Sequence, residues 1–333
     1  MTSADLERFT GGAAIGVDVA GIERDLAALW RQAATGTQAV TRACSWNLVV
    51  HAEGDAALDK AKLLADALVA IVPSRTLVLH HRPNATGPEI EAFVTANCRL
   101  MPGGGKLLCS EEITVESRGK GSDYLPSLTR ALLVPDIPTA VLCAGLPRES
   151  ALLQELLAAG DRLIIDSHGA EQLQPIERLG KALPRVADLA WLRTAPWRLA
   201  VAAAFDAPVD GSMLFRLTRV KLQCQRGWSS EARLLLGWLG ARLSWGTVED
   251  GMVQRQQGRV RLDTEFVEGP GMHVEFEAEG GGKVRVAAMA APLSDEALVT
   301  AALGPRGADR LYQASLRRAV ELESWMDCST KTS

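Results

Sequence analysis

The most constraining feature of this sequence is an alternation of short apolar runs with longer helical patterns over its first two-thirds. The runs are rich in β-branched residues, as buried strands are, and segments with helical spacing separate them. Strands joined through helices form parallel sheets with helices on both faces. The sequence therefore predicts an α/β fold with a mostly parallel, Rossmann-like sheet, whose strands include Trp46–His51, Arg75–His80, Ile137–Cys143 and Asp161–Asp166.

Helices are predicted between these strands from spacing and capping signals, among them one that starts at Asp55 and one through Leu152–Leu157. Ile22–Ala33 has helical apolar spacing, and Thr86-Gly-Pro-Glu89 is typical of a capping box that starts a helix through Ile90, Phe93 and Val94. A further helix is expected from Glu171 to Ala182. Lys106–Ser117 contains two β-rich runs separated by a polar interval.

The pattern changes after Asp206-Ala-Pro208. Met213–Gln223 alternates as a strand, and Ser229–Leu243 is an apolar helix. Three further strands with glycine-rich turns between them indicate a meander in an antiparallel sheet. We therefore expect an α/β domain over residues 1–206 and a smaller α+β domain with an antiparallel sheet over residues 207–333, the three strands being Gly258–Thr264, Met272–Ala278 and Lys283–Ala290.

The charge balance limits the class of partner. The 333 residues carry a net charge of −4 with a pI near 5.8, and the arginines are scattered along the sequence. No global positive field favours nucleic acid or an anionic membrane, so the expected partner is a protein or a small molecule. The first residues do not resemble a secretory signal and no apolar run is long enough for a membrane span, so we expect a cytoplasmic protein.

Six cysteines are spread along the chain without a CxxC motif or a cluster typical of a metal site. We expect most of them to be reduced thiols. Cys98 and Cys109 are the candidate redox pair, because only a short glycine-rich segment separates them.

No complete catalytic set can be assembled from the motifs. The glycine-rich turn before Lys106 leads into a strand rather than a helix, and no strand-to-helix junction carries the GxGxxG fingerprint of dinucleotide sites. His51, His80 and Asp166 lie at predicted strand ends, where α/β proteins place their sites. One hypothesis is thus a sugar-phosphate or nucleotide-binding enzyme with its site near these residues; we expect neither a metal nor a cofactor.

Tryptophan and arginine are concentrated in one short segment, Trp191-Leu-Arg-Thr-Ala-Pro-Trp-Arg198. Both residue types are enriched at protein-interface hot spots, and guanidinium groups stack on indole rings. Packing of a helix onto the sheet would use the same residues. The sequence leaves these two interpretations open.

Several stretches, in order along nearly the whole chain, resemble the OpcA family of glucose-6-phosphate dehydrogenase assembly proteins. The resemblance implies a non-catalytic partner that binds glucose-6-phosphate dehydrogenase and promotes its oligomerisation or activity as an allosteric activator. In cyanobacterial relatives that role is linked to redox control of the oxidative pentose phosphate pathway. A scaffold for another complex is the remaining alternative. The stretches are Thr41–Val50, Val72–Arg75, Cys98–Arg99, Cys109–Thr114, Leu125–Leu128, Leu133–Pro138, Asp161–Ser167, Asp188–Arg198 and Glu231–Trp245.

Within and beside these stretches we select candidate partner-binding residues by their charge or aromatic character. They are Arg75, Arg99, Glu111, Glu112, Trp191, Arg193, Trp197 and Arg198.

Overall fold

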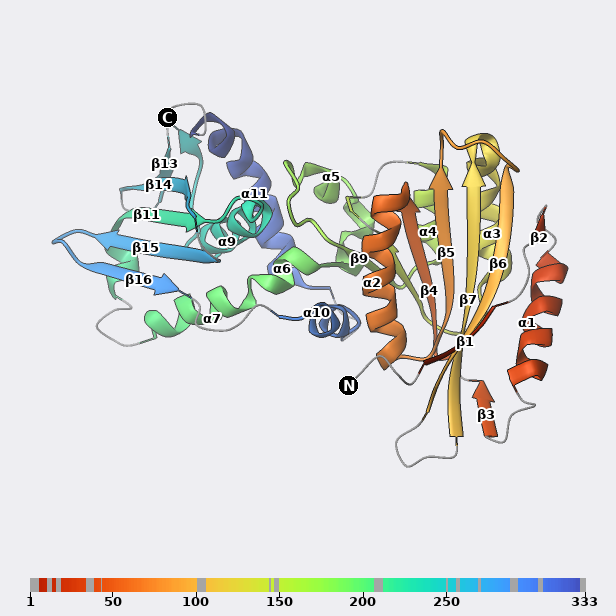
Figure 1. The fold of residues 1–333 in the computed structure, drawn as a ribbon. Coiled ribbons are helices and arrows are strands. Elements are labelled where there is room, and N and C mark those ends of the chain that lie inside the picture. Colours follow the sequence, from red (N-terminus) through yellow and green to blue (C-terminus); the bar gives the residue numbers. More distant parts are fainter. Residues whose placement is uncertain are drawn as a thin grey trace. The chain divides into compact units, whose positions relative to one another are not determined.

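The chain folds into two compact units (Figure 1). Unit 1 comprises Met1–Ile165 and Asp295–Arg306, and unit 2 comprises Asp166–Ser294 and Gly307–Ser333. The domain boundary predicted at 206/207 adjoins residues outside the described part of the chain and stays a prediction. The computed structural model describes residues 6–10, 14–15, 19–33, 39–42, 44–100, 106–143, 145–146, 150–206, 212–249, 251–255, 258–268, 271–287, 293–304 and 308–329.

The sheet of unit 1 has the strand order β1-β6-β7-β5-β4-β8-β9, while β2 pairs with β6 and β3 with β7. The run from β7 through β5, β4 and β8 to β9 is parallel, and β6 is antiparallel to both β7 and β1. The prediction of a mostly parallel sheet is confirmed. Its strands are β1 (Leu6–Thr10), β2 (Ala14–Ile15), β3 (Ala39–Arg42), β4 (Trp46–Glu53), β5 (Ser74–Arg82), β6 (Ile90–Leu100), β7 (Lys106–Arg118), β8 (Thr139–Cys143) and β9 (Arg162–Ile165).

Helices cover both faces of this sheet. α2 and α10 pack together on one face, whereas α1, α3 and α4 pack on the other (Figure 1). Because both faces are covered, the central strand β5 is buried over seven consecutive residues from Ser74 to His80. The helices are α1 (Val19–Ala33), α2 (Asp55–Ile71), the 3-10 helix η2 (Gly119–Tyr124), α3 (Leu125–Leu132), α4 (Ala151–Ala159) and α10 (Asp295–Ala302).

Unit 2 contains a six-stranded sheet in the order β12-β13-β14-β11-β15-β16. β11 is parallel to β14 and antiparallel to β15, so the sheet is mixed rather than purely antiparallel. The elements of unit 2 are α5 (Gln174–Glu177), η3 (Gly180–Arg185), β10 (Val186–Asp188), α6 (Leu189–Arg193), α7 (Ala195–Ala204), η4 (Ser212–Arg216), β11 (Leu217–Cys224), α9 (Ser229–Arg242), β12 (Val248–Glu249), β13 (Met252–Gln254), β14 (Arg259–Phe266), β15 (Met272–Ala278), β16 (Lys283–Ala287) and α11 (Arg310–Ser329).

One face of this sheet is packed and the other is solvated. Along β15, Met272, Val274 and Phe276 are buried, whereas the residues between them are partly exposed. The buried side is covered by α9, which packs against α11. The two helices approach closely at Gly237, where an added Cβ would lie 2.2 Å from the carbonyl oxygen of Ser315. Glycine is therefore required at this crossing.

Three local predictions were wrong. Ile90–Val94 is the start of strand β6, because its alternate residues Ile90, Ala92 and Val94 are buried and the backbone pairs with β7. The predicted helix over Glu171–Ala182 is reduced to α5 and η3, interrupted at Gly180, which has a positive φ of 52°. The predicted meander is interrupted, because β11 inserts between β14 and β15.

Candidate functional site

A largely buried charged network in unit 1 contains two of the predicted partner-binding residues, Arg75 and Glu111. Arg75 on β5 donates from Nε to Glu111 Oε1 at 2.5 Å and from Nη1 to Glu23 Oε1 at 2.7 Å. Its Nη1 also donates to the carbonyl oxygen of Leu132 at 3.0 Å. Trp30 Nε1 donates to the second oxygen of Glu111 at 3.3 Å. The network links α1, β5 and β7 and holds the interior of the unit together.

The remaining predicted residues of unit 1 are also interior or outside the described side chains. Glu112 is buried, and its Oε1 accepts from the hydroxyl of Thr114 at 3.4 Å. Arg99 belongs to β6, but its side chain lies outside the described residues. Direct contact with a partner through Arg75, Glu111 or Glu112 would require these side chains to leave the core, and that assignment stays a prediction.

The tryptophan- and arginine-rich segment of unit 2 packs inward. Trp191 is 2% and Trp197 4% exposed. Trp191 Nε1 donates to Asp309 Oδ2 at 2.9 Å, and Trp197 Nε1 donates to the carbonyl oxygen of Met272 at 2.7 Å. The guanidinium carbon of Arg198 lies 3.5 Å from the centroid of the Trp191 ring, and burial lowers the pKa of Arg198 to about 10. Core packing accounts for all of these contacts.

Arg193, the last predicted contact residue, belongs to a charged cluster that follows β9. It binds Asp166 in a bidentate manner, from Nη1 at 2.6 Å and from Nη2 at 3.1 Å. His168 Nδ1 lies 2.7 Å from Glu231 Oε1, and this hydrogen bond raises the pKa of His168. Glu231 is fully buried, whereas the side chain of His168 is 37% exposed. In this cluster, a histidine that is partly exposed to solvent is therefore hydrogen-bonded to a buried carboxylate.

A second buried carboxylate, Asp188, lies beside this cluster. It accepts from the backbone and hydroxyl of Ser167 at 3.1 and 2.7 Å, and it caps α6 through Ala190 N. The hydroxyl of Tyr312 lies 3.2 Å from its Oδ2. Burial raises the pKa of Asp188 to about 6 and that of Tyr312 above its ordinary value. The hydroxyl of Ser167 is thus hydrogen-bonded to Asp188. No sequence pattern indicated that Tyr312 would contact Asp188 or that Glu231 would contact His168.

The carboxyl ends of β4 and β5 carry the histidines on which the enzyme hypothesis depends. His51 is partly buried, which lowers its pKa. His80 Nε2 lies 3.2 Å from Asp55 Oδ1, without the geometry of a hydrogen bond, and Arg82 Nε lies 3.2 Å from the same oxygen. Asp55 is the first residue of α2, so a carboxylate occupies the helix start where a phosphate would be favoured.

His51 and His80 belong to unit 1 and Asp166 to unit 2. Asp166 is already paired with Arg193, and His81, next to His80, lies 2.9 Å from the hydroxyl of Ser117. Asp166 is therefore engaged within unit 2, whereas both ring nitrogens of His80 are buried without a hydrogen-bond partner, so the described residues show no hydrogen-bonded catalytic set at these strand ends.

The candidate redox pair lies on neighbouring antiparallel strands. The Cα atoms of Cys98 on β6 and Cys109 on β7 are register partners. Cys109 is disulfide-bonded, and the side chain of Cys98 lies outside the described residues. Cys143 and Cys224 are free thiols, and burial raises the pKa of Cys143 to about 12. A thiol with such a pKa stays protonated and unreactive near neutral pH.

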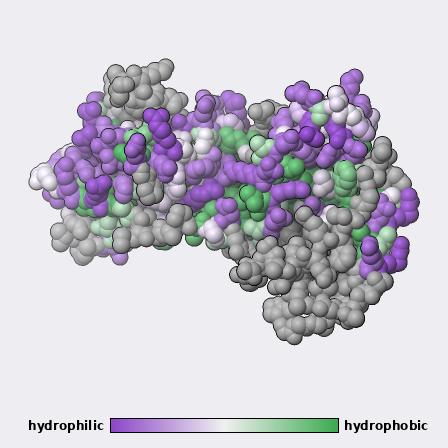
Figure 2. Space-filling model, in the orientation of Figure 1, coloured by the Kyte–Doolittle hydropathy of each residue, from purple (hydrophilic) through white to green (hydrophobic). Residues whose placement is uncertain are grey.

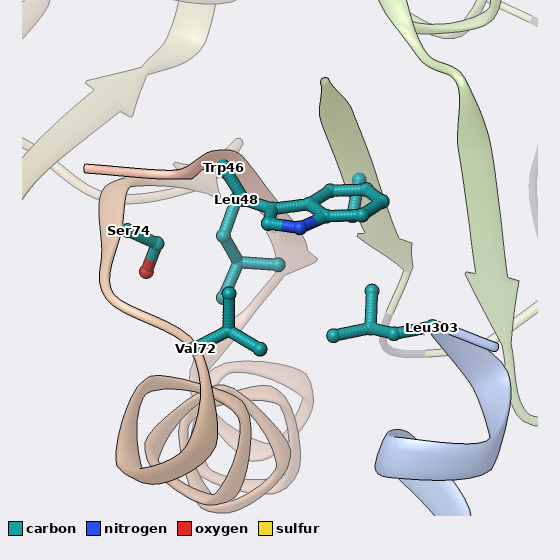
Figure 3. A pocket seen from close by; sticks show the side chains of 6 residues that line it. Trp46, Leu48, Val72, Ser74 and Leu303 are labelled. Carbon is teal, nitrogen blue, oxygen red and sulfur yellow. The ribbon is translucent and has the colours of Figure 1, made fainter. Parts of the chain in front are cut away.

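A small hollow with room for about one water molecule, partly open to solvent, lies at the amino ends of β4, β5 and β8. Figure 3 shows Leu48, Val72 and Leu303 converging near the indole of Trp46. The hydroxyl of Ser74 is 3.2 Å from that of Thr76, so it is already engaged. Ligand sites combine apolar walls with several convergent polar groups, usually at the carboxyl ends of strands. This hollow has apolar walls, but it lies at the amino ends and, apart from the indole of Trp46, Ser74 is the one polar side chain in its lining.

Metal-binding and membrane-spanning features are both lacking in the part of the chain that the structure describes. No group of three histidine, cysteine, aspartate or glutamate side chains is placed to hold a metal ion there. No helix among these residues is both long and apolar enough to cross a bilayer.

Comparison with known families gives a match in each half of the chain. Residues 65–181 match the N-terminal domain of the glucose-6-phosphate dehydrogenase subunit, and residues 184–323 match its C-terminal domain, both of the OpcA type. Together these two matches cover more than half of the chain. The chain belongs to the OpcA family, as its sequence resemblance implied.

The curated relatives that match are described as putative OxPP cycle proteins OpcA. The protein from Synechocystis sp. is 29% identical over 192 residues, which cover 56% of this chain and 40% of the relative. The protein from Nostoc punctiforme is 28% identical over 226 residues, covering 65% of this chain and 47% of the relative. The chain thus spans less than half the length of these relatives.

Among solved structures, an oxidoreductase from Thermotoga maritima has a TM-score of 0.45 at 9% identity, covering 86% of this chain and 96% of that chain. A likeness at this level carries no conclusion about activity.

Proposed function

We propose that this chain is a cytoplasmic, non-catalytic partner of glucose-6-phosphate dehydrogenase that promotes its assembly and raises its activity allosterically. The observation that carries the proposal is the family match over both domains, residues 65–181 and 184–323. The engagement of Asp166 and Ser167 in hydrogen bonds within unit 2 agrees with it.

The test uses the purified chain and glucose-6-phosphate dehydrogenase from the same organism. The enzyme is titrated with the chain while the oxidation rate and the oligomer size are followed, the latter by size-exclusion chromatography. We expect both to rise to a plateau, and heat-denatured chain to have no effect. An unchanged rate and oligomer size, or substrate turnover by the chain without the enzyme, would refute the proposal.

The eight predicted partner-binding residues remain part of this proposal, but the buried ones act by supporting the fold rather than by touching the partner. Because Trp191 and Trp197 are buried, they support α7 from within rather than touch a partner. Arg198 is only partly buried but stacks on the ring of Trp191, so its substitution is tested together with a measurement of folding. We expect Arg198→Ala to weaken activation at unchanged circular dichroism; full activation by the folded variant would remove this segment from the contact surface.

We further propose that Cys98 and Cys109 form a redox-sensitive pair that modulates binding. The register of the two Cα atoms and the disulfide at Cys109 support this. An external dithiol would reduce the bond: two electrons and two protons yield two thiols, while the dithiol becomes a disulfide. We expect reduction to change activation by the wild type and by Cys224→Ser, but not by Cys109→Ser. Equal activation by oxidised and reduced wild type would contradict the proposal.

A further inference from the structure

A group of five arginines gathers at one corner of the unit 2 sheet, although the whole chain has a net charge of −4. We call this group, Arg216, Arg219, Arg255, Arg259 and Arg261, the arginine corner. Arg219 on β11 and Arg261 on β14 are register partners in parallel strands. Arg259 lies two residues before Arg261 on the same face, because the residue between them is buried. Three guanidinium groups therefore share the solvated face of the sheet.

The other two arginines are joined to this face through η4. Arg255 Nη1 donates to the carbonyl oxygen of Phe215 at 2.7 Å. This contact ties the end of η4 to the segment between β13 and β14. Arg216 follows Phe215 directly and precedes β11, and its side chain is exposed. Residues far apart in sequence are thus brought to one corner by the pairing of β11 with β14.

The positive charge of the corner is only partly balanced. Asp263 pairs with Arg219 at 2.5 Å and with Arg261 at 3.2 Å. Glu279 is close to Arg216, since its backbone nitrogen donates to the Arg216 carbonyl oxygen at 3.0 Å. Within the described residues, the other three arginines make no ion pair. Arginine is always charged in proteins, so the five cations against Asp263 and Glu279 leave a net charge of +3. Glu277, the register partner of Arg219 on β15, is balanced by its ion pair with Lys283.

The corner combines exposed cations with an exposed aromatic ring. The side chain of Arg261 is 64% exposed and Phe215 is 75% exposed. A guanidinium group binds a carboxylate through two parallel hydrogen bonds, which gives both affinity and orientation. Arginine and aromatic side chains also dominate protein-interface hot spots. The surface is suited to a segment that carries carboxylates beside an apolar residue.

The neighbouring strand limits the length of such a segment. β15 pairs with β11 on the side away from β14, and it presents Glu275 and Glu277 on the solvated face. Figure 2 shows a largely hydrophilic surface over the strands of unit 2. Lys283 pairs with both carboxylates, so beyond the corner the charges of this face are balanced and no continuous positive surface extends along it to hold a long polyanion such as nucleic acid. A short acidic segment fits the corner alone.

We propose that the arginine corner docks a short acidic segment of a partner protein, with Phe215 as its apolar contact. This inference rests on the proposed function in one respect: the proposed function identifies the partner as glucose-6-phosphate dehydrogenase. The guanidinium groups of the corner supply the charge that attracts the segment. Arg259 and Arg261, on the solvated face of β14, are two exposed members of this group.

The experiment compares the double variant Arg259→Glu/Arg261→Glu with wild type and with Arg285→Glu. Arg285 is an exposed arginine on β16, at the opposite side of the same sheet, so it controls for charge reversal as such. Each protein is titrated, at low and high salt, with a fluorescent poly-glutamate peptide that ends in phenylalanine and with single-stranded DNA of equal length. Binding is followed by fluorescence anisotropy, and folding by circular dichroism.

We expect wild type and Arg285→Glu to bind the peptide in a salt-sensitive manner, and the double variant to bind about tenfold or more weakly, as charge reversal at an electrostatic contact does. Equal peptide binding by wild type and the double variant, or preference of wild type for DNA, would overturn the inference. A misfolded double variant is replaced by Arg261→Gln, for which we expect a smaller loss in the same direction.

A second titration uses glucose-6-phosphate dehydrogenase in place of the peptide. If wild type and the double variant bind the enzyme equally, the corner is not the contact, although the proposed function stands. If wild type does not bind the enzyme, the proposed function fails and the peptide titration alone decides the inference.

Discussion

Two arginine–carboxylate pairs in this protein have the same nitrogen–oxygen distance but opposite environments. Arg75 and Glu111 in unit 1 are 2.5 Å apart, with side chains 6% and 2% exposed. Arg219 and Asp263 in unit 2 are also 2.5 Å apart, with side chains 39% and 23% exposed. The difference follows from the sheets, since β5 is covered on both faces and β11 on one. Equal distances therefore do not mean equal contributions to stability. Removing one partner of a buried pair leaves an uncompensated charge in the interior, whereas water solvates the charge that remains from an exposed pair.

The largest effect is expected where this comparison is tested directly. Arg75→Met leaves the Glu111 carboxylate buried without its cation and should destabilise the protein by about 3–5 kcal/mol. The matched variant Arg219→Met should cost about 0.2–1 kcal/mol. Chemical denaturation of both variants measures the two free energies. Similar losses would mean that burial does not separate the two pairs.

The next effect concerns a buried aromatic residue of unit 2. Trp197→Phe keeps most of the apolar volume but leaves the carbonyl oxygen of Met272 without its donor, at a cost of about 1–3 kcal/mol. Leu199→Ala on the same helix is the control, because Leu199 is 71% exposed and should change stability by less than about 0.5 kcal/mol. Thermal and denaturant unfolding would detect the difference; an unaffected Trp197→Phe variant would show that water replaces the indole donor.

The pair of buried Glu231 and partly exposed His168 should make the stability of the protein depend on pH. The pKa of His168 is raised above its ordinary value of 6.5 by Glu231, so its stabilising contribution is fully present below pH 6.5 and is lost as pH rises through the folded pKa. Unfolding free energies measured from pH 6 upward should therefore fall more steeply for wild type than for His168→Asn. Parallel pH profiles for the two proteins would exclude this linkage.

The smallest effect is expected at the arginine corner. Arg259→Ala and Arg261→Ala remove exposed side chains from a solvated sheet face, so each should change the unfolding free energy by less than about 0.5 kcal/mol. Denaturant midpoints provide the measurement. A loss above that range would assign these arginines to stability and weaken the case that they serve binding.

Local sequence patterns predicted the secondary structure correctly where burial of a segment is visible in its own residues. The apolar runs at Trp46–His51 and Arg75–His80 are strands of one sheet because a strand covered on both faces must be apolar along its length. The ordered family stretches likewise identified the OpcA family. The same reasoning failed at Ile90–Val94, where capping residues favoured a helix but pairing with β7 satisfied the backbone as a strand.

What the sequence determined by itself was the α/β class of the first sheet and the family, because both depend on patterns that are local or ordered along the chain. Only the tertiary structure decided which charges are buried and which meet. Glu231 is 63 residues from His168, and Arg261 is far from its register partner Arg219. Strand register and helix packing set such distances, and no local pattern encodes them, since each depends on how separate elements pair.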